Sequence, residues 1–410
     1  MEKHGRFLQG MLCGVCVTAL GLAGVEIFDY AEVTKAQSAS ELNLDLKSNS
    51  RKIKKIEDII NEYFYEDVDS EQVEDYIYKG MIAGLDDKYA AYYTQEELAR
   101  MQESTNGEYD GIGVTITQDA DTGYAVIAGC YKGTPAAEAG LQAEDVIKKV
   151  NGQDISGMDL TSIVSLIKTA EGDQVILTIS RKGETEDLEI PVERRRVEVP
   201  TVEYEMLDGN IGYIKIAEFD AVTTEQFREA KAALEEDGME KLIVDLRSNL
   251  GGVLDTVCDI LREILPEGLI VYTENKNGER EEYTCDGTKE LQIPLAVLIN
   301  GYSASASEIF AGAVKDYGIG TLVGTTTYGK GIVQQTIGLS DGSAVKLTIA
   351  KYFTPLGHDI HGKGVEPDVE VELDEKLAGQ TEIAKKEDNQ LQKAIEILQQ
   401  TEQEGAADAG

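Results

Sequence analysis

Ser305 is the first residue of this chain whose setting points to chemistry. It is the middle serine of Ser303-Ala304-Ser305-Ala306-Ser307, a run that follows an apolar segment at 295–299. A serine among small residues at a strand-to-helix turn can present its hydroxyl beside free backbone N–H groups, which is the geometry a nucleophile needs. A helix cap rich in serine and alanine would have a similar sequence, so this run by itself leaves both interpretations open.

Lys330 is the second such residue, and it lies between Gly329 and Gly331 in a stretch without other charges. A lone lysine is usually a solvated surface charge, but flanking glycines indicate close backbone packing around this one. A serine hydroxyl needs a base to take its proton. A lysine serves only when neutral, and lowering its pKa from about 10.4 to about 7–8 corresponds to about 4 kcal/mol, which burial in an apolar cleft can supply. Ser305 and Lys330 would then form a Ser-Lys hydrolytic pair.

A third stretch, Asp245-Leu246-Arg247-Ser248-Asn249-Leu250-Gly251-Gly252, leaves an apolar strand and enters a helix through paired glycines. Glycines there let backbone N–H groups turn inward and form an anion pocket at a helix start. A plain strand-to-helix turn explains this stretch about equally well. In the hydrolytic interpretation, N–H groups of Gly251 or Gly252 and of Ala306 would hold the negative charge of a tetrahedral intermediate.

The elements that would position these residues alternate between strand and helix over residues 196–373. Strands are expected at 211–216, 242–246, 295–299, 320–323 and 344–351, and helices at 224–236, 254–264 and 306–317. Thr223, with Gln226 three residues later, resembles a capping box at the start of the first helix. The alternation predicts an α/β layered core.

The rest of the chain divides into segments that differ in residue pattern and composition. Residues 106–195 consist of short strand-like segments with two short helices and predict a compact β-rich domain. Residues 52–105 have helical apolar spacing but too little apolar material for a core of their own, so we expect them to pack on a neighbour or on a second copy. Residues 29–51 predict a linker, and residues 374–410 a Glu- and Gln-rich helix with a small-residue tail.

The N-terminus has the pattern of an export segment. Lys3 and Arg6 precede an apolar run from Phe7 to Phe28, whose uncharged part, 7–25, is long enough for one bilayer crossing. A positive start followed by an apolar run predicts a signal peptide or signal anchor over residues 1–28. We favour an uncleaved anchor, because the cleavage candidate before Ala39 lies far from the apolar run. The rest of the chain would then lie outside the cytoplasm of a bacterial cell, in the envelope.

Composition excludes several classes of function. Lys+Arg is 38 and Asp+Glu is 76, a net charge of −38 that would repel phosphate backbones and argues against a nucleic-acid binder. The three histidines, His4, His358 and His361, limit zinc sites and Ser-His-Asp triads. The five cysteines do not form a disulfide framework. No metal or other cofactor is expected.

The motifs Asp-Leu-Arg-x-Asn-x-Gly-Gly, Ser-Ala-Ser-Ala-Ser-Glu and Gly-Lys-Gly-x-Val-Gln-Gln, in this order, resemble the C-terminal processing peptidases, or tail-specific proteases. The resemblance spans about residues 52–372. It implies that Ser305 is the nucleophile and Lys330 the base, that Gln334 orients the lysine and that Asp316 supports activity. It also implies a multidomain α/β fold with a helical N-terminal segment, a PDZ domain and a crotonase-like Ser-Lys peptidase core.

The sequence Tyr109-Asp110-Gly111-Ile112-Gly113-Val114 resembles the carboxylate-binding loop of a PDZ domain. Consecutive N–H groups of such a loop hold a peptide's terminal carboxylate while the peptide adds a strand to the sheet. The candidate peptide-binding residues are Gly111, Ile112, Gly113, Val114 and Lys168. The apolar side chains at Ile112, Val114 and 163–166 would favour apolar tails. Lys168 stands where the family often has an arginine thought to couple peptide binding to activation, and a lysine cannot make the same bidentate contact.

Together these observations predict an envelope-anchored serine endopeptidase that captures protein C-termini through its PDZ domain and cleaves them through an acyl-enzyme. The alternative is an inactive PDZ-bearing scaffold that binds C-terminal tails, which the retention of Ser305, Lys330 and Gln334 argues against. A base drawn from His358 or His361 is disfavoured, because both lie in a polar glycine-rich loop. Residues 52–103 and 380–403 could form homodimer contacts or pack within the chain, and the sequence leaves both open.

Overall fold

The computed structural model describes residues 42–119, 122–380 and 383–408, and its contacts divide the chain into two units. The smaller unit comprises Met1–Leu98 with Gln334–Thr348, and the larger comprises Ala99–Val333 with Ile349–Gly410. The predicted anchor at 1–28 lies outside the described residues, as does the predicted linker up to residue 41. None of the helices that are described is both long and apolar enough to cross a membrane.

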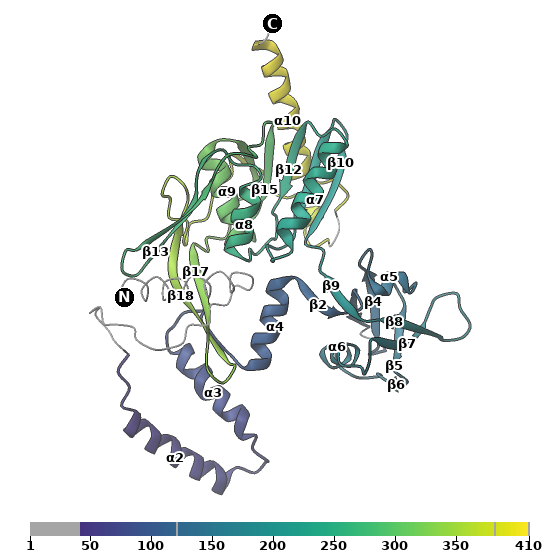
Figure 1. The fold of residues 1–410 in the computed structure, drawn as a ribbon, viewed down its shortest axis with the longest axis vertical. Coiled ribbons are helices and arrows are strands. Elements are labelled where there is room, and N and C mark those ends of the chain that lie inside the picture. The colour runs from purple at the N-terminus through teal and green to yellow at the C-terminus, as the bar shows by residue number, and fades with distance from the viewer. Residues whose placement is uncertain (1–41, 120–121, 381–382, 409–410) are drawn as a thin grey trace, which may run out of the picture. The chain divides into compact units, whose positions relative to one another are not determined.

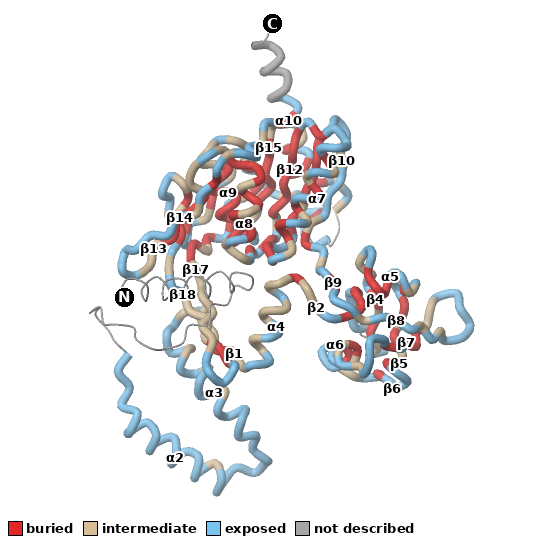
Figure 2. The backbone as a smooth tube through the Cα atoms, in the orientation of Figure 1, coloured by how far each residue is buried: buried red, intermediate tan, exposed pale blue. Residues whose placement is uncertain are grey.

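The larger unit is built around a six-stranded sheet in the order β10-β11-β12-β15-β16-β19 (Figure 1). The strands are β10 (Val202–Leu207), β11 (Ile211–Ile216), β12 (Lys241–Asp245), β15 (Leu295–Ile299), β16 (Gly320–Gly324) and β19 (Val369–Glu370). β10 is antiparallel to β11, and the other neighbours run parallel. Every residue of β12 and β15 is buried, as expected of parallel strands covered on both faces (Figure 2).

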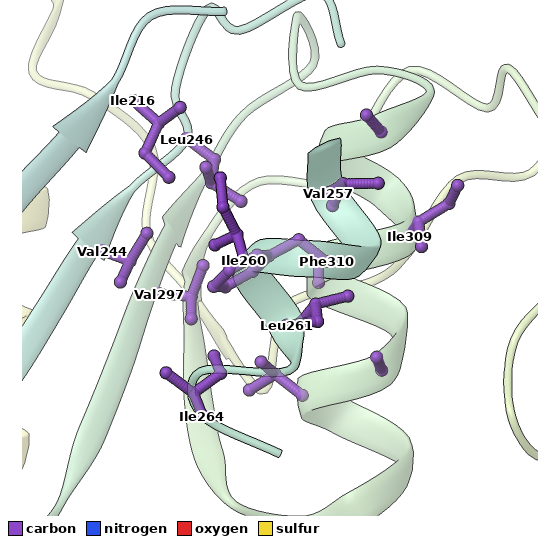
Figure 3. Close-up of a cluster of buried hydrophobic side chains, with 14 of the residues drawn as sticks. Ile216, Val244, Leu246, Val257, Ile260, Leu261, Ile264, Val297, Ile309 and Phe310 are labelled. Atoms are coloured by element: carbon purple, nitrogen blue, oxygen red, sulfur yellow. The ribbon is translucent and has the colours of Figure 1, made fainter. Parts of the chain in front are cut away.

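Three helices, α7 (Thr223–Glu236), α8 (Leu254–Leu261) and α9 (Ala306–Tyr317), contribute to the core on one face of this sheet. Val244 and Val297 from the strands share this core with Ile260 of α8 and Phe310 of α9 (Figure 3). Phe310 and Ile260 are fully buried. The predicted α/β layered core is therefore confirmed.

The opposite face of the sheet is covered by α10 (Asn389–Asp408). Ile243 and Leu298 alternate with the residues that face α8 and α9, so they project to the other side. They form a second core with Leu391, Ala394 and Leu398 of α10. The C-terminal helix is thus a layer of the α/β core.

A second sheet contains strands that the sequence did not predict. β13 (Gly268–Asn275) pairs antiparallel with β14 (Arg280–Cys285) and, through Tyr272 and Phe353, with the C-terminal half of β18 (Ala344–Phe353). In the smaller unit, β18 pairs with β1 (Ala91–Tyr93), and β17 (Ile332–Gly338) also pairs with β18. β14 is mostly exposed, so it lacks the apolar run by which the central strands were predicted.

The β-rich domain has an antiparallel sheet in the order β3-β4-β5-β7-β8 and a hydrophobic core of its own. Its elements are β3 (Val114–Gln118), β4 (Ala125–Cys130), α5 (Pro135–Glu138), β5 (Val146–Val150), β6 (Gln153–Asp154), α6 (Leu160–Lys168), β7 (Gln174–Ser180) and β8 (Leu188–Glu193). The two chain connections to this domain, β2 (Glu108–Gly111) and β9 (Arg195–Glu198), pair with each other as an antiparallel ribbon. The predicted compact domain with two short helices is therefore observed.

The N-terminal helices are α2 (Leu46–Tyr63), α3 (Ser70–Ala83) and α4 (Gln95–Asn106). No residue of α2 or α3 is buried. α2 begins inside the predicted linker at 29–51, because the Asp45 side chain accepts a hydrogen bond from the Ser48 N–H at 3.0 Å and caps the helix.

The predicted capping box at Thr223 and Gln226 is wrong. The Gln226 side chain accepts from the Thr201 N–H at 2.8 Å and donates to the Val199 carbonyl at 3.0 Å, so it holds the segment before β10. The Thr223 hydroxyl accepts from the Asp220 N–H at 2.9 Å. Gln226 therefore bonds to a segment distant in sequence, and Thr223 bonds to the turn that precedes the helix.

Candidate active site

Ser305 occupies the turn between β15 and α9, beyond the carboxyl end of a central parallel strand. Its backbone has φ +55° and ψ −113°, a conformation that residues other than glycine rarely adopt. Ser303 supports the turn: its hydroxyl accepts from the Asn300 N–H at 2.9 Å and donates to the Leu246 carbonyl at 2.8 Å. This is the sharp strand-to-helix turn that can expose a serine hydroxyl above a sheet.

Asn249 joins the loop that follows β12 to the serine turn. It is fully buried, and its carbonyl oxygen accepts from the Ala304 N–H at 3.0 Å and from the Ser307 hydroxyl at 2.9 Å. Its Nδ2 donates to the Ile216 carbonyl at 2.9 Å. The Asp-Leu-Arg and Ser-Ala-Ser motifs therefore form one hydrogen-bonded structure.

Two glycines of this loop sit where a side chain would not fit. A Cβ on Gly251, whose φ is +106°, would lie 2.7 Å from the Ala304 carbonyl oxygen and 2.7 Å from the Cβ of Ser305. A Cβ on Gly252, whose φ is +145°, would lie 2.3 Å from the Phe219 carbonyl oxygen. Glycine at both positions lets this loop approach the serine turn and the strand end.

The N–H groups of the two glycines differ. The Gly251 N–H donates to the Asn249 Oδ1 at 2.8 Å. Within the described residues, the N–H groups of Gly252 and Ala306 have no hydrogen-bond acceptor. A Cβ on Gly251 would lie 3.0 Å from the Ala306 nitrogen, so the two segments are adjacent. The sequence offered Gly251 or Gly252 as the partner of Ala306. Of the two, Gly252 has the N–H group that is available to an oxyanion.

The carboxylate of Glu308 joins the serine turn to the lysine loop. Glu308 is fully buried, and its Oε2 accepts from the N–H groups of Ser305 at 2.9 Å and Lys330 at 2.8 Å. Its Oε1 accepts from the Gly329 N–H and the Thr327 hydroxyl, each at 2.6 Å. Sequence reasoning did not place Glu308 in the site. Its position three residues after Ser305, the spacing of a capping box, was the available signal.

Tyr352 provides a second link between the same two segments. Its hydroxyl oxygen lies 2.9 Å from the carbonyl oxygen of Ser305 and 2.7 Å from that of Lys330. Burial raises the pKa of Tyr352 well above its ordinary value, so the phenol stays neutral and can donate. The structure therefore brings the main chains of Ser305 and Lys330 to one buried hydroxyl, and the sequence held no signal for this tyrosine.

The glycines beside Lys330 pack closely against the backbone at 361–364. A Cβ on Gly329, whose φ is +90°, would lie 3.0 Å from the Lys363 nitrogen, and one on Gly331 would lie 2.7 Å from the His361 nitrogen. The close backbone packing expected from the flanking glycines is therefore observed. Lys330 itself is half-buried.

Gln334 belongs to the smaller unit. Its Nε2 donates to the Tyr89 carbonyl at 2.6 Å, so it contacts the Leu85-Asp86-Asp87-Lys88-Tyr89 segment. This contact brings together two stretches of the smaller unit that are 245 residues apart in sequence. The role of Gln334 in orienting Lys330 stays a prediction.

Asp316 lies near the C-terminal end of α9, about 16 Å along the helix from Ser305. Its Oδ2 accepts from the Leu356 N–H at 2.8 Å, and its Oδ1 is 3.7 Å from Nε2 of His358. Asp316 therefore holds the turn at 354–358, and its side chain contacts neither Ser305 nor Lys330. This arrangement places His358 beside Asp316 and further disfavours it as a base for Ser305.

The loop Gly111-Ile112-Gly113-Val114 lies between the ribbon strand β2 and strand β3. Its carbonyl groups are held from one side: the Ile112 carbonyl accepts from the Ala136 N–H at 2.8 Å, and the Gly113 carbonyl from the Tyr131 N–H at 3.0 Å. Gly113 has φ +82°, as a loop that turns its N–H groups in one direction requires. Ile112 is buried in the core of the β-rich domain.

Lys168 ends α6 and forms an ion pair with Glu103 of α4, with 2.5 Å between Nζ and Oε2. Its Nζ lies 5.0 Å from the centre of the Tyr109 ring. Burial raises the pKa of Tyr109 to about 12, so this phenol is neutral. Lys168 is thus already paired, and coupling of peptide binding to activation through it stays a prediction.

Three family models match the chain. Residues 210–371 match peptidase family S41, residues 126–181 match the PDZ domain, and residues 15–97 match the activating protease CtpB N-terminal domain. The β-rich domain is therefore a PDZ domain, as expected.

Known proteins resemble most of the chain. A probable CtpA-like serine protease of Staphylococcus aureus (strain COL) is 34% identical over 373 residues, which cover 90% of this chain and 73% of that protein. The photosystem II D1 C-terminal processing protease is 31% identical, with a TM-score of 0.46 over 79% of this chain and 88% of that one. A putative S41 protease from Bacteroides fragilis NCTC 9343 has the same fold, with a TM-score of 0.51 and 18% identity over 89% of this chain and 100% of that one.

The order of the motifs, the joined serine and lysine loops and the similarity to the CtpA-like serine proteases agree, and the chain belongs to peptidase family S41 as a serine peptidase that carries a PDZ domain.

Proposed function

We propose that this peptidase cleaves proteins near their C-termini with Ser305 as nucleophile and Lys330 as general base, through an acyl-enzyme. The observation that carries this proposal is the double link between the two residues' main chains, through the Glu308 carboxylate and the Tyr352 hydroxyl. Both links are buried. The same groups that support the strained serine turn hold the main chain of Lys330, which supports this assignment.

In the proposed acylation step, the neutral amine of Lys330 takes the hydroxyl proton of Ser305 as Oγ bonds to the scissile carbonyl carbon. The N–H groups of Gly252 and Ala306 stabilise the resulting oxyanion. The C–N bond then breaks, and the leaving amine receives the proton from Lys330. In deacylation Lys330 takes a proton from water as the water oxygen bonds to the ester carbonyl carbon. The bond from that carbon to Ser305 Oγ then breaks, Oγ takes the proton back from Lys330, and the product leaves as a carboxylic acid.

We propose that the PDZ domain selects the substrate. A substrate carboxylate would be held by N–H groups of the loop Gly111-Ile112-Gly113-Val114, and the tail would add a strand to the sheet. The apolar residues of the loop and of α6 favour apolar tails. Ile163 and Ile167 of α6 are buried in the domain core, which leaves the half-buried Val164 and Leu166 as apolar residues on which a tail could pack.

We also propose that residues 7–25 anchor the chain in the membrane, with the peptidase on the extracytoplasmic side. The basic residues at the start and the uncharged apolar run support this placement. Two measurements on cells that express the full chain test this placement. Fractionation shows whether the chain is in the membrane, and protease treatment of spheroplasts shows whether the peptidase lies outside the cytoplasmic membrane. Recovery of the full-length chain in the soluble cytosolic fraction would contradict it.

The test of the catalytic assignment uses a quenched fluorescent peptide with a free apolar C-terminus. We expect Ser305→Ala and Lys330→Met to lower kcat by about 10⁴-fold or more. Ser340→Ala and Lys276→Met, at exposed positions, are the matched controls and should cleave like the wild type. Amidation of the peptide's C-terminus should raise KM more than it lowers kcat, because the carboxylate contact serves binding.

The pH dependence separates lysine catalysis from other mechanisms. The rate should fall as pH drops through the value at which Lys330 becomes protonated, because only the neutral amine accepts a proton. A rate that stays flat down to pH 5 would exclude Lys330 as the base. If wild type and Ser305→Ala bind the peptide equally and neither cleaves it, the protein is a scaffold that binds C-terminal tails.

A further inference from the structure

Arg247 of the Asp-Leu-Arg motif is held in a buried network that the proposed reaction does not use. Its guanidinium pairs with Asp245 at the end of β12, with 2.5 Å between Nη2 and Oδ2. The same carboxylate oxygen of Asp245 accepts from the Tyr213 hydroxyl at 2.8 Å. Burial would lower the pKa of Arg247, but its two carboxylate partners, Asp245 and Asp388, raise it, so the cation is stabilised in place.

The second carboxylate comes from the C-terminal segment, 141 residues further along the chain. Asp388 accepts from both terminal nitrogens of Arg247, at 3.0 Å to Oδ1 and 2.8 Å to Oδ2, the bidentate geometry of a strong charge-assisted pair. Gln390 adds a third contact, with its Oε1 3.0 Å from Nη1 of Arg247. Asp388 and Gln390 are only 4% and 3% exposed, so water does not compete for these contacts.

Asp388 is itself fixed by the helix it begins. Its Oδ1 accepts from the N–H groups of Gln390 at 3.1 Å and Leu391 at 3.0 Å, at the start of α10. Leu391 and Leu398 of α10 are buried against the sheet face opposite α8 and α9. The first turn of this helix, where Asp388 is capped, therefore determines where the Arg247 guanidinium can lie.

Arg247 begins the loop that ends in the oxyanion donor Gly252. Between them, the Ser248 N–H donates to Asn300 Oδ1 at 2.9 Å, and Asn249 carries the contacts to the serine turn. Ser248 has φ +62°, so the loop is also strained at this point. If Arg247 moved, the five residues that follow it would move with it, because they form no helix or strand that would hold them in place.

We propose that Asp388 is a positioning residue for catalysis: through Arg247 it holds the loop that presents the Gly252 N–H to the oxyanion, which makes the C-terminal helix part of the active-site framework. This inference rests on the proposed function. It also extends the functional core beyond residue 371, where the match to the S41 family model ends.

The test compares Asp388→Asn, Asp388→Glu and Leu398→Ala in the full chain. Asparagine keeps the size and the oxygen that caps α10 but removes the charge that Arg247 requires. Glutamate keeps the charge. Leu398→Ala is the matched control, because it removes apolar packing from the same helix without touching Arg247.

Two measurements separate positioning from general loss of stability. The first is kcat and KM on the peptide substrate, well below the unfolding temperature of each variant. The second is the affinity for a peptide boronate, which bonds to the serine oxygen and forms a tetrahedral anion that the oxyanion donors must hold. Binding of a non-cleavable apolar C-terminal peptide to the PDZ domain serves as the readout that should not change.

For Asp388→Asn we expect kcat and boronate affinity to fall together by about 10- to 100-fold, with KM and PDZ binding unchanged. Asp388→Glu should recover part of both losses. Leu398→Ala should unfold at a lower temperature but keep kcat and boronate affinity. The inference is wrong if folded Asp388→Asn matches the wild type in both measurements, or if Leu398→Ala loses as much activity as Asp388→Asn.

Failure of this inference is distinguishable from failure of the proposed function. If the wild type neither cleaves the peptide nor binds the boronate, the serine mechanism fails regardless of Asp388. If the wild type does both and Ser305→Ala does neither, the mechanism stands, and the Asp388 variants then test the positioning role alone.

Discussion

The serine and lysine loops of the core and the N-terminal helix α2 are stabilised in opposite ways. These loops are short irregular segments with positive φ at Ser305 and Gly329, and each is held by several buried hydrogen bonds. α2 has regular geometry throughout, yet its apolar residues Ile53, Ile56 and Ile59 are 44%, 48% and 49% exposed. Of these two regions, the one with the irregular backbone has dense tertiary contacts, and the one with the regular backbone has few.

This contrast shows where local sequence determines conformation. α2 is supported by its Asp45 cap and by the pairs of Lys54 with Glu57 and Asp58, all within four residues. The conformation of Ser305 costs free energy and persists because Glu308, itself bonded to the lysine loop, and Tyr352, 47 residues away, hold it. Substitutions should accordingly have large effects at the loops and small effects on α2.

Apart from the substitutions of Ser305 and Lys330, the largest expected effect is that of Gly251→Ala. The new Cβ would overlap the Ala304 carbonyl and the Ser305 Cβ, and φ of +106° adds backbone strain. We expect kcat/KM to fall by about 10³-fold, comparable to the loss of an oxyanion donor. Gly238→Ala is the matched control, because Gly238 has φ +87° but no atom within 4 Å of the added Cβ. An equal loss in both variants, measured on the peptide substrate, would show that backbone strain alone matters.

Next in size is Glu308→Gln. The two carboxylate oxygens of Glu308 now accept four hydrogen bonds, two each. Glutamine replaces one of these oxygens with an NH2 group, so two of the four buried donors lose their acceptor. We expect a loss of about 3 kcal/mol in the free energy of unfolding and a fall in kcat of about 10²-fold. Denaturant unfolding and peptide cleavage measure these, with the exposed Glu229→Gln on α7 as control. Unchanged stability would contradict the role of Glu308 as the link between the two loops.

A smaller, pH-dependent effect is expected at Asp220. It follows Phe219, whose N–H and carbonyl bond to Gly251 and Val253 at 2.9 and 2.7 Å. Burial, with a smaller contribution from Glu218, raises the pKa of Asp220 to about 7. Because this exceeds the unfolded value of about 3.9, the contribution to stability is intact below about pH 4 and is lost as pH rises through about 7.

Asp220→Asn should therefore be more stable than the wild type at pH 8, by about 2 kcal/mol, and equal to it at pH 4. Denaturant unfolding at both pH values measures this difference. The exposed Asp208→Asn is the matched control. A stabilisation of the same size at both pH values would mean that the carboxyl group does not titrate near pH 7 in the folded state.

The smallest effect is expected for Ile56→Ala on α2. At 48% exposure this side chain loses little buried area, and the free energy of unfolding should change by less than about 0.5 kcal/mol. Ile260→Ala in the core, where the side chain is fully buried, should cost about 2–5 kcal/mol. A large loss at Ile56 that grows with protein concentration, followed by sedimentation, would indicate that this face is buried in a homodimer.

The sequence predicted the central elements well because their signals are local. Strands 211–216 and 295–299 are apolar runs bounded by turn residues, and the structure has β11 and β15 at those bounds. The helix at 306–317 was likewise predicted to its ends. Strands β14 and β17 were not predicted, since their mostly exposed or half-buried residues give no continuous apolar run. β13 was not predicted either, although it contains the apolar run Leu269-Ile270-Val271-Tyr272, whose last three residues are buried.

Polar side chains were harder to interpret than apolar ones. Gln226 fits a capping box by spacing, but its amide bonds to Val199 and Thr201 because the fold brings them closer than its own helix start. The sequence could offer Gly251 and Gly252 as equal candidates. Only the bond from the Gly251 N–H to Asn249 distinguishes them.

Residue types and their order in the chain were enough to determine the reaction class and the presence of a PDZ domain, and to predict the pairing of Ser305 with Lys330. Such properties depend on motifs that are contiguous in sequence. Tertiary structure alone decided that Glu308, Tyr352 and Asp388 support those motifs. Their contacts to Lys330 span 22 residues and the contact to Arg247 spans 141, and a hydrogen bond or ion pair across such a separation exists only once the sheet and its two covering layers have packed.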